Sequence, residues 1–203
     1  MKKIYKRSSE ILMEIAQDKS LKGNLTFRRI LKMLGDRTFG VGLLFFSLPS
    51  ALPFSAIPGV SLVFGIPIII FAFQMLFARK TLWLPKVIAD HAIHHEKVSK
   101  IIYIANPYLT TVEKLLKPRL TFMLSRIMEV INGFTIFCLA LLLMLPIPFS
   151  NFIFSILIIV FSLGVIEKDG LFIIIGYIAT FFYIIFSYIF IVVAVKSIIN
   201  WVM

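Results

Sequence analysis

Two long apolar runs of this chain are each interrupted by a proline-rich kink that contains Pro-Phe-Ser. The first is LFFSLPSALPFSAIPG, from Leu44 to Gly59, and the second is LALLLMLPIPFSN, from Leu139 to Asn151. Proline lacks a backbone donor and crowds the preceding turn, so a helix breaks there. In a long uncharged stretch such a break is tolerated inside protein or beside water. The pair therefore predicts two related, broken helical hairpins with a working site between them.

The composition favours a membrane setting for these hairpins. Hydrophobic residues make up 60% of the 203 residues and the mean hydropathy is +0.98, which is more apolar surface than a soluble domain of this length can bury. The net charge is +11, and residues 1–37 hold ten Lys and Arg while residues 79–129 hold nine. The positive-inside rule places both segments, and the amino terminus, in the cytoplasm. Because these clusters flank membrane segments and lack aromatic stacking partners, we expect membrane lipids as their partner and no nucleic acid.

We therefore expect an all-α integral membrane protein with a single membrane domain over residues 1–203. Its expected parts are an amphipathic cytoplasmic region (1–37), a first hairpin (38–78), a cytoplasmic interfacial linker (79–130), a second hairpin (131–170) and a carboxyl-terminal membrane helix (171–203). The uncharged arms of the second hairpin, 133–145 and 152–166, reach only about 20 and 22 Å at 1.5 Å per residue. Since the hydrocarbon core is about 30 Å thick, a re-entrant hairpin is predicted.

Both basic segments are predicted to contain amphipathic helices. Apolar residues recur with helical spacing after Thr26, which can cap the helix, and Gly35 ends it. This helix lies either at the lipid headgroups or against the protein's own cytoplasmic face. A second helix is expected from 86 to 102. Its histidines, His91, His94 and His95, are expected on its surface rather than as metal ligands, and no cofactor is predicted.

A shift of 95 residues aligns the two kinks. It places Leu52-Pro53-Phe54-Ser55 on Ile147-Pro148-Phe149-Ser150, and Gln74-Met75-Leu76-Phe77 on Asp169-Gly170-Leu171-Phe172. We interpret this as an internal repeat of unknown orientation whose proline tips face each other in mid-membrane.

Polar residues at the ends of broken membrane segments are candidates for function. The candidates for ligand binding are Asp36, Arg37, Gln74, Arg79, Arg119, Asn151, Glu167 and Asp169. The guanidinium groups suit phosphate oxygens, and the carboxylates can pair with them or carry protons. The alternative is that residues 167–170 form a solvated turn and that Asp36 and Arg37 form an interfacial pair. Ser55 and Ser150 are expected to satisfy backbone groups at the kinks. With no catalytic constellation in the sequence, no enzyme is predicted.

An ordered set of short motifs resembles the ExoD exopolysaccharide-synthesis family of bacterial integral membrane proteins. The motifs are LGDR-x-FG (34–40), IPG (57–59), Gln74 followed by WLP (83–85), KPR (117–119), LPIPFSN (145–151) and LGVIEKDG (163–170). The resemblance covers nearly the whole chain. The chain departs from the expected pattern at Ala78-Arg79, where Gly-Arg is expected, and after Asn151, where a proline is expected. The resemblance implies a multi-pass protein of the bacterial inner membrane linked with exopolysaccharide production and, in some members, with alkali tolerance.

Three roles follow as expectations. The first is binding or translocation of a phosphate-bearing lipid, such as a polyprenyl-phosphate carrier. The second is proton or cation transport through Asp36, Glu167 and Asp169. The third is a non-catalytic membrane scaffold, with a homo-oligomer or polysaccharide-assembly proteins as partners.

Overall fold

Helices account for most of the chain. The computed structural model describes residues 7–18, 25–52, 60–79, 81–145 and 150–202, and within these ranges it contains two isolated β-bridges but no strand. The α-helices are α1 (Ser8–Gln17), α2 (Phe27–Leu34), α3 (Thr38–Ser47), α4 (Val60–Leu76), α5 (Lys86–Ala89), α6 (His95–Leu115), α7 (Arg126–Met144), α8 (Ser150–Glu167) and α9 (Gly170–Val202). Three 3-10 helices, η2 (Gly35–Arg37), η3 (Pro49–Ala51) and η5 (Thr121–Leu124), connect them. The predicted all-helical class is confirmed.

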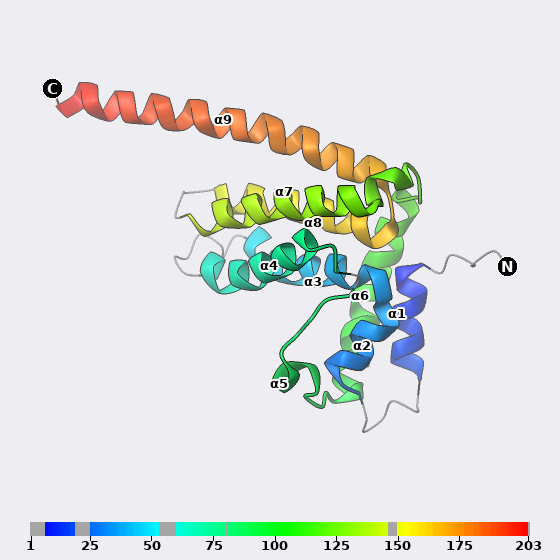
Figure 1. The fold of residues 1–203 in the computed structure, drawn as a ribbon. Coiled ribbons are helices and arrows are strands. Elements are labelled where there is room, and N and C mark those ends of the chain that lie inside the picture. Colours follow the sequence, from blue (N-terminus) through cyan, green and yellow to red (C-terminus); the bar gives the residue numbers. More distant parts are fainter. Residues whose placement is uncertain (1–6, 19–24, 53–59, 80, 146–149, 203) are drawn as a thin grey trace.

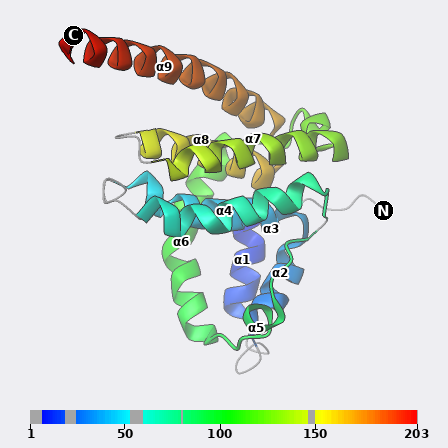
Figure 2. The ribbon, with the colours of Figure 1, turned by 60° about the vertical axis from the view of Figure 1, so that its left-hand side comes forward.

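Helices α3, α4, α7 and α8 form a bundle of two antiparallel hairpins (Figure 1). The first hairpin is α3 with α4 and the second is α7 with α8, and between them α3 packs on α8 while α4 packs on α7. The bundle core is built from aliphatic and aromatic side chains, including Phe39, Leu43, Ile68, Met75, Ile136, Leu139 and Phe161. Helix α9 packs on α8 near its start, and its far end extends away from the bundle in both views (Figures 1 and 2).

The two hairpins point in the same direction. The end of α3 and the start of α4 lie at the same end of the bundle as the end of α7 and the start of α8 (Figures 1 and 2). If the two hairpins are exchanged, α3 takes the place of α7 and α8 takes the place of α4, so the contact of α3 with α8 becomes the contact of α7 with α4. A two-fold axis parallel to the bundle produces this relation. The sequence left the orientation of the repeat open, and the described helices have the parallel arrangement. The kinks themselves, 53–59 and 146–149, lie outside the described residues, Ser55 and the Ile57-Pro58-Gly59 motif included.

The 95-residue offset does not continue into the second arm of each hairpin. Gln74 lies within α4, whereas Asp169 comes after the end of α8, and Gly170 already begins α9. Helices α4 and α8 begin at Val60 and Ser150, which is a separation of 90 residues. The second of the two sequence matches is therefore wrong, because short apolar segments align easily by chance.

Glycines allow the two hairpins to approach closely. A Cβ atom on Gly40 of α3 would lie 2.6 Å from Cγ1 of Ile166 in α8, and one on Gly133 of α7 would lie 2.7 Å from Cβ of Met75 in α4. Each of the two contacts between the hairpins thus contains a position where only hydrogen fits. Small residues at such crossings are typical of tightly packed apolar helices.

The arms of the second hairpin are longer than the sequence predicted. Helix α7 starts at Arg126 rather than at 133 and has 19 residues, and α8 has 18. At 1.5 Å per residue they reach about 28 and 27 Å. The predicted arm was too short because it contained only uncharged residues, whereas the first turns of α7 carry Arg126 and Glu129. Two helical segments, Arg126–Met144 and Gly170–Phe190, are long and apolar enough to cross a membrane.

A second layer of α1, α2 and α6 runs across the direction of the bundle at one end of it (Figures 1 and 2). Its own small core contains Ile15, Leu25 and Ile102. Helix α2 begins and ends as predicted: the Thr26 hydroxyl accepts a hydrogen bond from the backbone N–H of Arg29 at 3.4 Å, and Gly35 ends the helix with φ +54°. The apolar side of α2 packs on this core and on the bundle core, which decides in favour of packing on the protein itself.

The helix predicted from 86 to 102 is wrong in its extent. Helix α5 stops at Ala89, and α6 starts at His95 and continues to Leu115. Between them the backbone pairs with the segment before α2, because the N–H of Ile93 donates to the carbonyl of Leu25 at 2.8 Å. This interstrand-like contact takes the donors and acceptors that a continuous helix would use.

Candidate functional site

Three of the short motifs meet where the bundle joins the second layer. We call this cluster the motif junction and define it as Asp36, Arg37, Arg119, Glu167, Lys168 and Asp169. The Lys168 ammonium lies 3.4 Å from a carboxylate oxygen of Asp36, which joins the start of the first hairpin to the end of the second. Arg37 and Glu167 are buried, with 5% and 4% of their surfaces exposed, and η2 packs against α8.

Asp169 is the most completely enclosed residue of the motif junction. It has no exposed surface, and its carboxylate accepts hydrogen bonds from the backbone N–H of Lys117 at 3.0 Å, from Arg119 Nε at 3.1 Å and from the backbone N–H of Leu171 at 3.0 Å. Burial acts to raise the pKa of Asp169, but these donors together outweigh it, so the pKa is lowered from the ordinary value of an aspartate. The bond to Leu171 also caps the first turn of α9.

The backbone strengthens the contact between Asp169 and the 117–120 segment. The N–H of Gly170 donates to the carbonyl of Arg119 at 2.8 Å, and Arg119 and Asp169 form an isolated parallel bridge. A Cβ on Gly170 would overlap the carbonyl oxygen of Leu120, so the glycine of this motif permits the close approach. The turn at residues 167–170 is therefore a buried structural contact, and the alternative of a solvated turn is wrong for Glu167 and Asp169.

A basic pocket lies beside the motif junction, between α2 and the segment that follows α4. We define the basic pocket as the cavity of about 540 Å³ lined by Arg28, Leu31, Lys32, Arg79, Thr81, Leu82, Trp83, Leu84 and Ala89. It combines three cationic side chains with a threonine hydroxyl and an apolar wall. Arg28 donates to both carboxylate oxygens of Asp90, at 2.6 and 3.0 Å. Within the described residues, no carboxylate forms an ion pair with Lys32 or Arg79.

The ion pair of Arg28 with Asp90 is exposed to solvent. The hydrogen bond from Arg28 lowers the pKa of Asp90, and the same bond raises the pKa of Arg28. Both groups are charged at neutral pH in any case, so the pair fixes the position of Arg28 without removing its charge from the rim of the basic pocket.

One wall of the basic pocket is fixed to α4 by Gln74. Its amide Nε2 donates to the carbonyl of Trp83 at 3.1 Å, and the N–H of Trp83 donates to Gln74 Oε1 at 2.7 Å. The side chain is 7% exposed. Gln74 thus uses both of its polar atoms to hold the WLP segment, which makes it a positioning residue for the wall rather than a direct contact for a ligand.

Arg79 reaches the basic pocket through an unusual turn at the end of α4. The N–H of Ala78 donates to the carbonyl of Met75 at 2.8 Å and the N–H of Arg79 donates to that of Gln74 at 3.4 Å, which is a Schellman motif. Ala78 has φ +47°, a left-handed conformation that favours glycine. The left-handed backbone therefore explains why a glycine is expected at position 78.

The predicted candidates fall into three groups. Asp36, Arg37, Arg119, Glu167 and Asp169 come together in the motif junction, and Gln74 and Arg79 belong to the basic pocket. Asn151 is half-buried in the first turn of α8, at the opposite end of that helix from Glu167. At 1.5 Å per residue the two are separated by about 24 Å. The eight residues therefore do not form one site.

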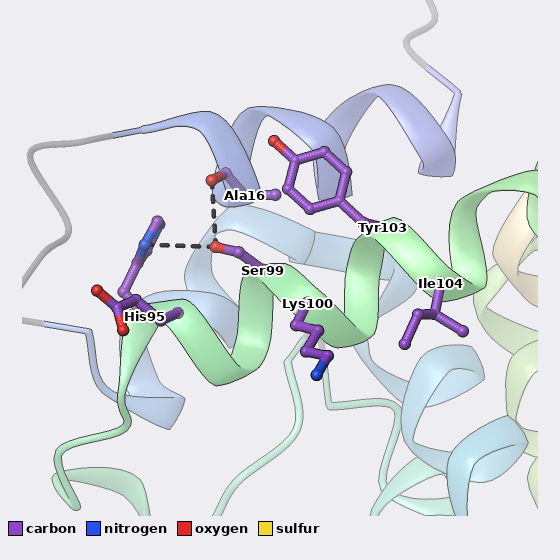
Figure 3. A pocket seen from close by; sticks show the side chains of 7 residues that line it. Ala16, His95, Ser99, Lys100, Tyr103 and Ile104 are labelled. Atoms are coloured by element: carbon purple, nitrogen blue, oxygen red, sulfur yellow. Dashed lines mark hydrogen bonds between the residues drawn. The ribbon is translucent and has the colours of Figure 1, made fainter.

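The histidines do not form a metal site in the part of the chain that the structure describes, where no group of three potential ligands occurs. His91 and His94 are exposed, but His95 is 7% exposed, so the prediction of a surface position is wrong for it. Its Nε2 lies 3.0 Å from the carbonyl of Ile15, and Nδ1 lies 3.3 Å from the Ser99 hydroxyl, which donates to the carbonyl of Ala16 at 3.1 Å (Figure 3). These bonds hold the end of α1 against α6.

Sequence reasoning missed three polar residues, two that line the basic pocket and one that makes buried hydrogen bonds. Lys32 was assigned only to the polar side of α2, and Thr81 was not singled out, yet both line the basic pocket. Asn132 is 2% exposed, donates to the carbonyl of Met123 at 3.0 Å and accepts from the Tyr177 hydroxyl at 2.6 Å. An asparagine directly before an apolar run is the signal that would have identified it.

In its described residues the chain is an all-helical protein whose two hairpins are joined at one end by polar contacts. Two of these helices are long and apolar enough to cross a membrane. Residues 8–189 match the family model described as exopolysaccharide synthesis, ExoD. The chain is 36% identical to the protein ExoD of Rhizobium meliloti over 78% of its length and 67% of that protein. It is 34% identical to an uncharacterized protein of Synechocystis over 70% of its length and 68% of that protein. The chain belongs to the ExoD family. No solved structure matches it.

Proposed function

We propose that this chain is a multi-pass protein of the bacterial inner membrane that takes part in exopolysaccharide synthesis by binding, and passing across the membrane, a phosphate-bearing lipid such as a polyprenyl phosphate. The ExoD family is one of exopolysaccharide synthesis. The observation that carries the proposal is the basic pocket, where Lys32 and Arg79 are free of carboxylate partners among the described residues and face a partly apolar wall. We propose a binding role and no catalytic step.

The surface of the bundle supports the membrane setting. Large apolar side chains are exposed along α4 and α9, among them Val63 at 66%, Phe73 at 51%, Phe182 at 65% and Phe186 at 62%. A soluble monomer rarely exposes so much contiguous apolar surface. In this setting the layer of α1, α2 and α6 stands on the cytoplasmic side, with the amino terminus. The two hairpins enter from that side and are re-entrant or nearly spanning.

The chemistry of the basic pocket fits a lipid phosphate. A guanidinium and an ammonium supply charged donors for phosphate oxygens, and the Thr81 hydroxyl supplies a neutral one. Leu31, Leu82 and Trp83 provide apolar contact for the first carbons of the lipid chain. The motif junction is a weaker candidate, since Arg119 already donates to Asp169 and Arg37 is buried. Asp169 is also a weak candidate for a proton carrier, because its carboxylate already accepts hydrogen bonds from Lys117, Arg119 and Leu171.

A binding measurement tests the proposal. The purified protein in detergent is titrated with undecaprenyl phosphate and, separately, with undecaprenol, and binding is followed by native mass spectrometry. We expect Arg79→Gln and Lys32→Gln each to weaken binding of the phosphate about tenfold, since one charged hydrogen bond contributes on the order of 1.5 kcal/mol. Lys97→Gln removes the same charge outside the pocket and should bind as wild type does. Equal affinity for the phosphate and the alcohol would contradict the proposal.

Passage across the membrane needs its own assay. The protein is reconstituted in vesicles that carry a labelled polyprenyl phosphate, and exposure of the phosphate to an external phosphatase is measured with and without a proton gradient. Faster exposure with wild type than with Arg79→Gln is expected. Unchanged exposure with wild type under every gradient would reduce the proposal to binding alone.

A further inference from the structure

Helix α6 carries an exposed apolar stripe that none of the other described elements covers. Four large side chains recur at spacings of three, four and seven residues, and their exposed fractions are 63% for Ile101, 61% for Ile104, 73% for Tyr108 and 67% for Leu115. At 100° per residue they project to one side of the helix. We call these four residues the α6 stripe. The buried residues Ser99, Ile102 and Glu113 lie on a different side, against α1 and its surroundings.

We propose that the α6 stripe inserts into the headgroup region of an anionic bilayer leaflet. The inference rests on the membrane setting of the proposed function but not on the basic pocket. An amphipathic helix with large apolar residues on one side and lysines beside them is typical of helices that lie in the membrane interface.

The charges of α6 identify the kind of surface. Lys97 continues the line of the stripe at its amino end, and Lys100 lies along one edge of it, both exposed. Of the two acids of α6, Glu96 is exposed farther round the helix, on the same side as Lys114, and Glu113 is 2% exposed and accepts hydrogen bonds from the backbone N–H and the hydroxyl of Ser9 at 2.6 Å. The accessible charge beside the stripe is therefore positive, which complements anionic lipid headgroups.

The direction of α6 agrees with this surface. It runs across the bundle axis in both ribbon views, so it lies in the plane of the bilayer when the bundle is inserted (Figures 1 and 2). In the close view Lys100 and Ile104 point away from α1, while Tyr103 lies on the side nearer to it (Figure 3). Ile104 and Lys100 also border an open depression of about 540 Å³, whose other lining includes Glu96 and Tyr103. An acyl chain or a headgroup has room there.

A second copy of the chain is a poorer occupant. A heptad-like stripe can form a coiled coil, but Lys97 lies in line with it and Lys100 lies on its edge, and like charges facing each other across a helix pair destabilise it. An anionic lipid surface attracts these lysines, whereas a second copy of α6 would repel them.

The test places an environment-sensitive label on α6 of the full-length protein. In a Cys138→Ser background, Ile104→Cys and Tyr108→Cys report on the stripe, and Glu96→Cys is the matched control on an exposed position outside it. Each variant is labelled with NBD and reconstituted in phosphatidylcholine vesicles with and without phosphatidylglycerol. Because all three positions are exposed, the variants should fold, which circular dichroism checks.

We expect the label at 104 and at 108 to emit at shorter wavelength than the label at 96 and to be quenched by spin-labelled lipid, with the difference increasing in phosphatidylglycerol. Replacing Lys97 and Lys100 together by glutamine should abolish the dependence on the anionic lipid. Aqueous emission at 104 and 108 in both vesicles would overturn the inference. A shift that vanishes when the protein is diluted in lipid would also overturn it and assign the stripe to a second copy. Failure of undecaprenyl phosphate to bind would leave these results unchanged.

Discussion

The carboxylate of Asp169 is predicted to be a structural centre of the fold, and its removal should destabilise the protein strongly. Asp169→Ala leaves the backbone N–H groups of Lys117 and Leu171, whose bonds to this carboxylate are partly buried, without their acceptor. Each buried donor left unsatisfied costs about 1 to 3 kcal/mol. The Arg119 side chain is 43% exposed, so water can replace much of the ion pair that it loses with Asp169. We expect a loss of about 3 to 5 kcal/mol in the free energy of unfolding.

The assay is equilibrium unfolding of the purified protein in mixed micelles with increasing dodecyl sulfate, followed by circular dichroism. Asp36→Ala is the matched control, because it removes the same charge from the same junction at a side chain that is 78% exposed. It should change stability by less than about 0.5 kcal/mol. Asp169→Asn keeps one oxygen acceptor and should fall between the two. If Asp169→Ala unfolded within about 1 kcal/mol of wild type, the reasoning from its hydrogen bonds would be refuted.

Three further predictions concern the same fold. The pKa of Asp169 is lowered in the folded state, so its contribution to stability is present above the unfolded pKa of about 3.9 and is lost as the pH falls through the folded pKa. Asp169→Ala should therefore lack this part of the decline in unfolding free energy that the wild-type protein shows on acidification. Ala78→Gly should raise the unfolding free energy by up to about 1 kcal/mol in the same detergent assay, because it relieves a left-handed alanine; a loss of stability would show that the φ of +47° carries no strain. Gly133→Val should lower the unfolding free energy by about 2 kcal/mol or more, because the added side chain would overlap Met75 and the backbone of α4. Val130→Ile, which adds one methylene to a half-buried side chain about one turn earlier, is the control and should change stability less.

The fold was predictable where local chemistry and hydrophobic pattern agree. The cap at Thr26, the stop at Gly35 and the break after Ser47 all depend on neighbouring residues, and the structure has them as predicted. Helix limits failed where a polar turn continues an apolar helix, as at the start of α7. The extent of the 86–102 helix failed for a different reason, since the pairing of Ile93 with Leu25 is a contact between distant segments that no local pattern contains.

The candidate site was predictable in part for the same reason. The motifs around Asp36, Arg119 and Asp169 were singled out as separate pieces, and the structure explains their common occurrence by bringing them together. What the sequence does not contain is the distance between them, so the buried carboxylate was assigned to ligand binding or proton transport. Ion pairs and hydrogen bonds across 50 residues depend on the packing of α8, α9 and η5, which only the folded chain defines.

Charge pairing decides which cations of the chain remain available for an anionic ligand. Sequence alone treats Arg37, Arg79 and Arg119 as equivalent phosphate binders. In the folded chain Arg119 donates to Asp169 and Arg37 is buried, which leaves Arg79 as the exposed arginine of the three that lines a cavity. Lys32 joins it there from α2, a helix that the sequence placed either at the lipid headgroups or against the protein's own cytoplasmic face. Because an anionic ligand binds where positive charge is accessible, the proposed site lies beside α2, where Lys32 and Arg79 line one cavity.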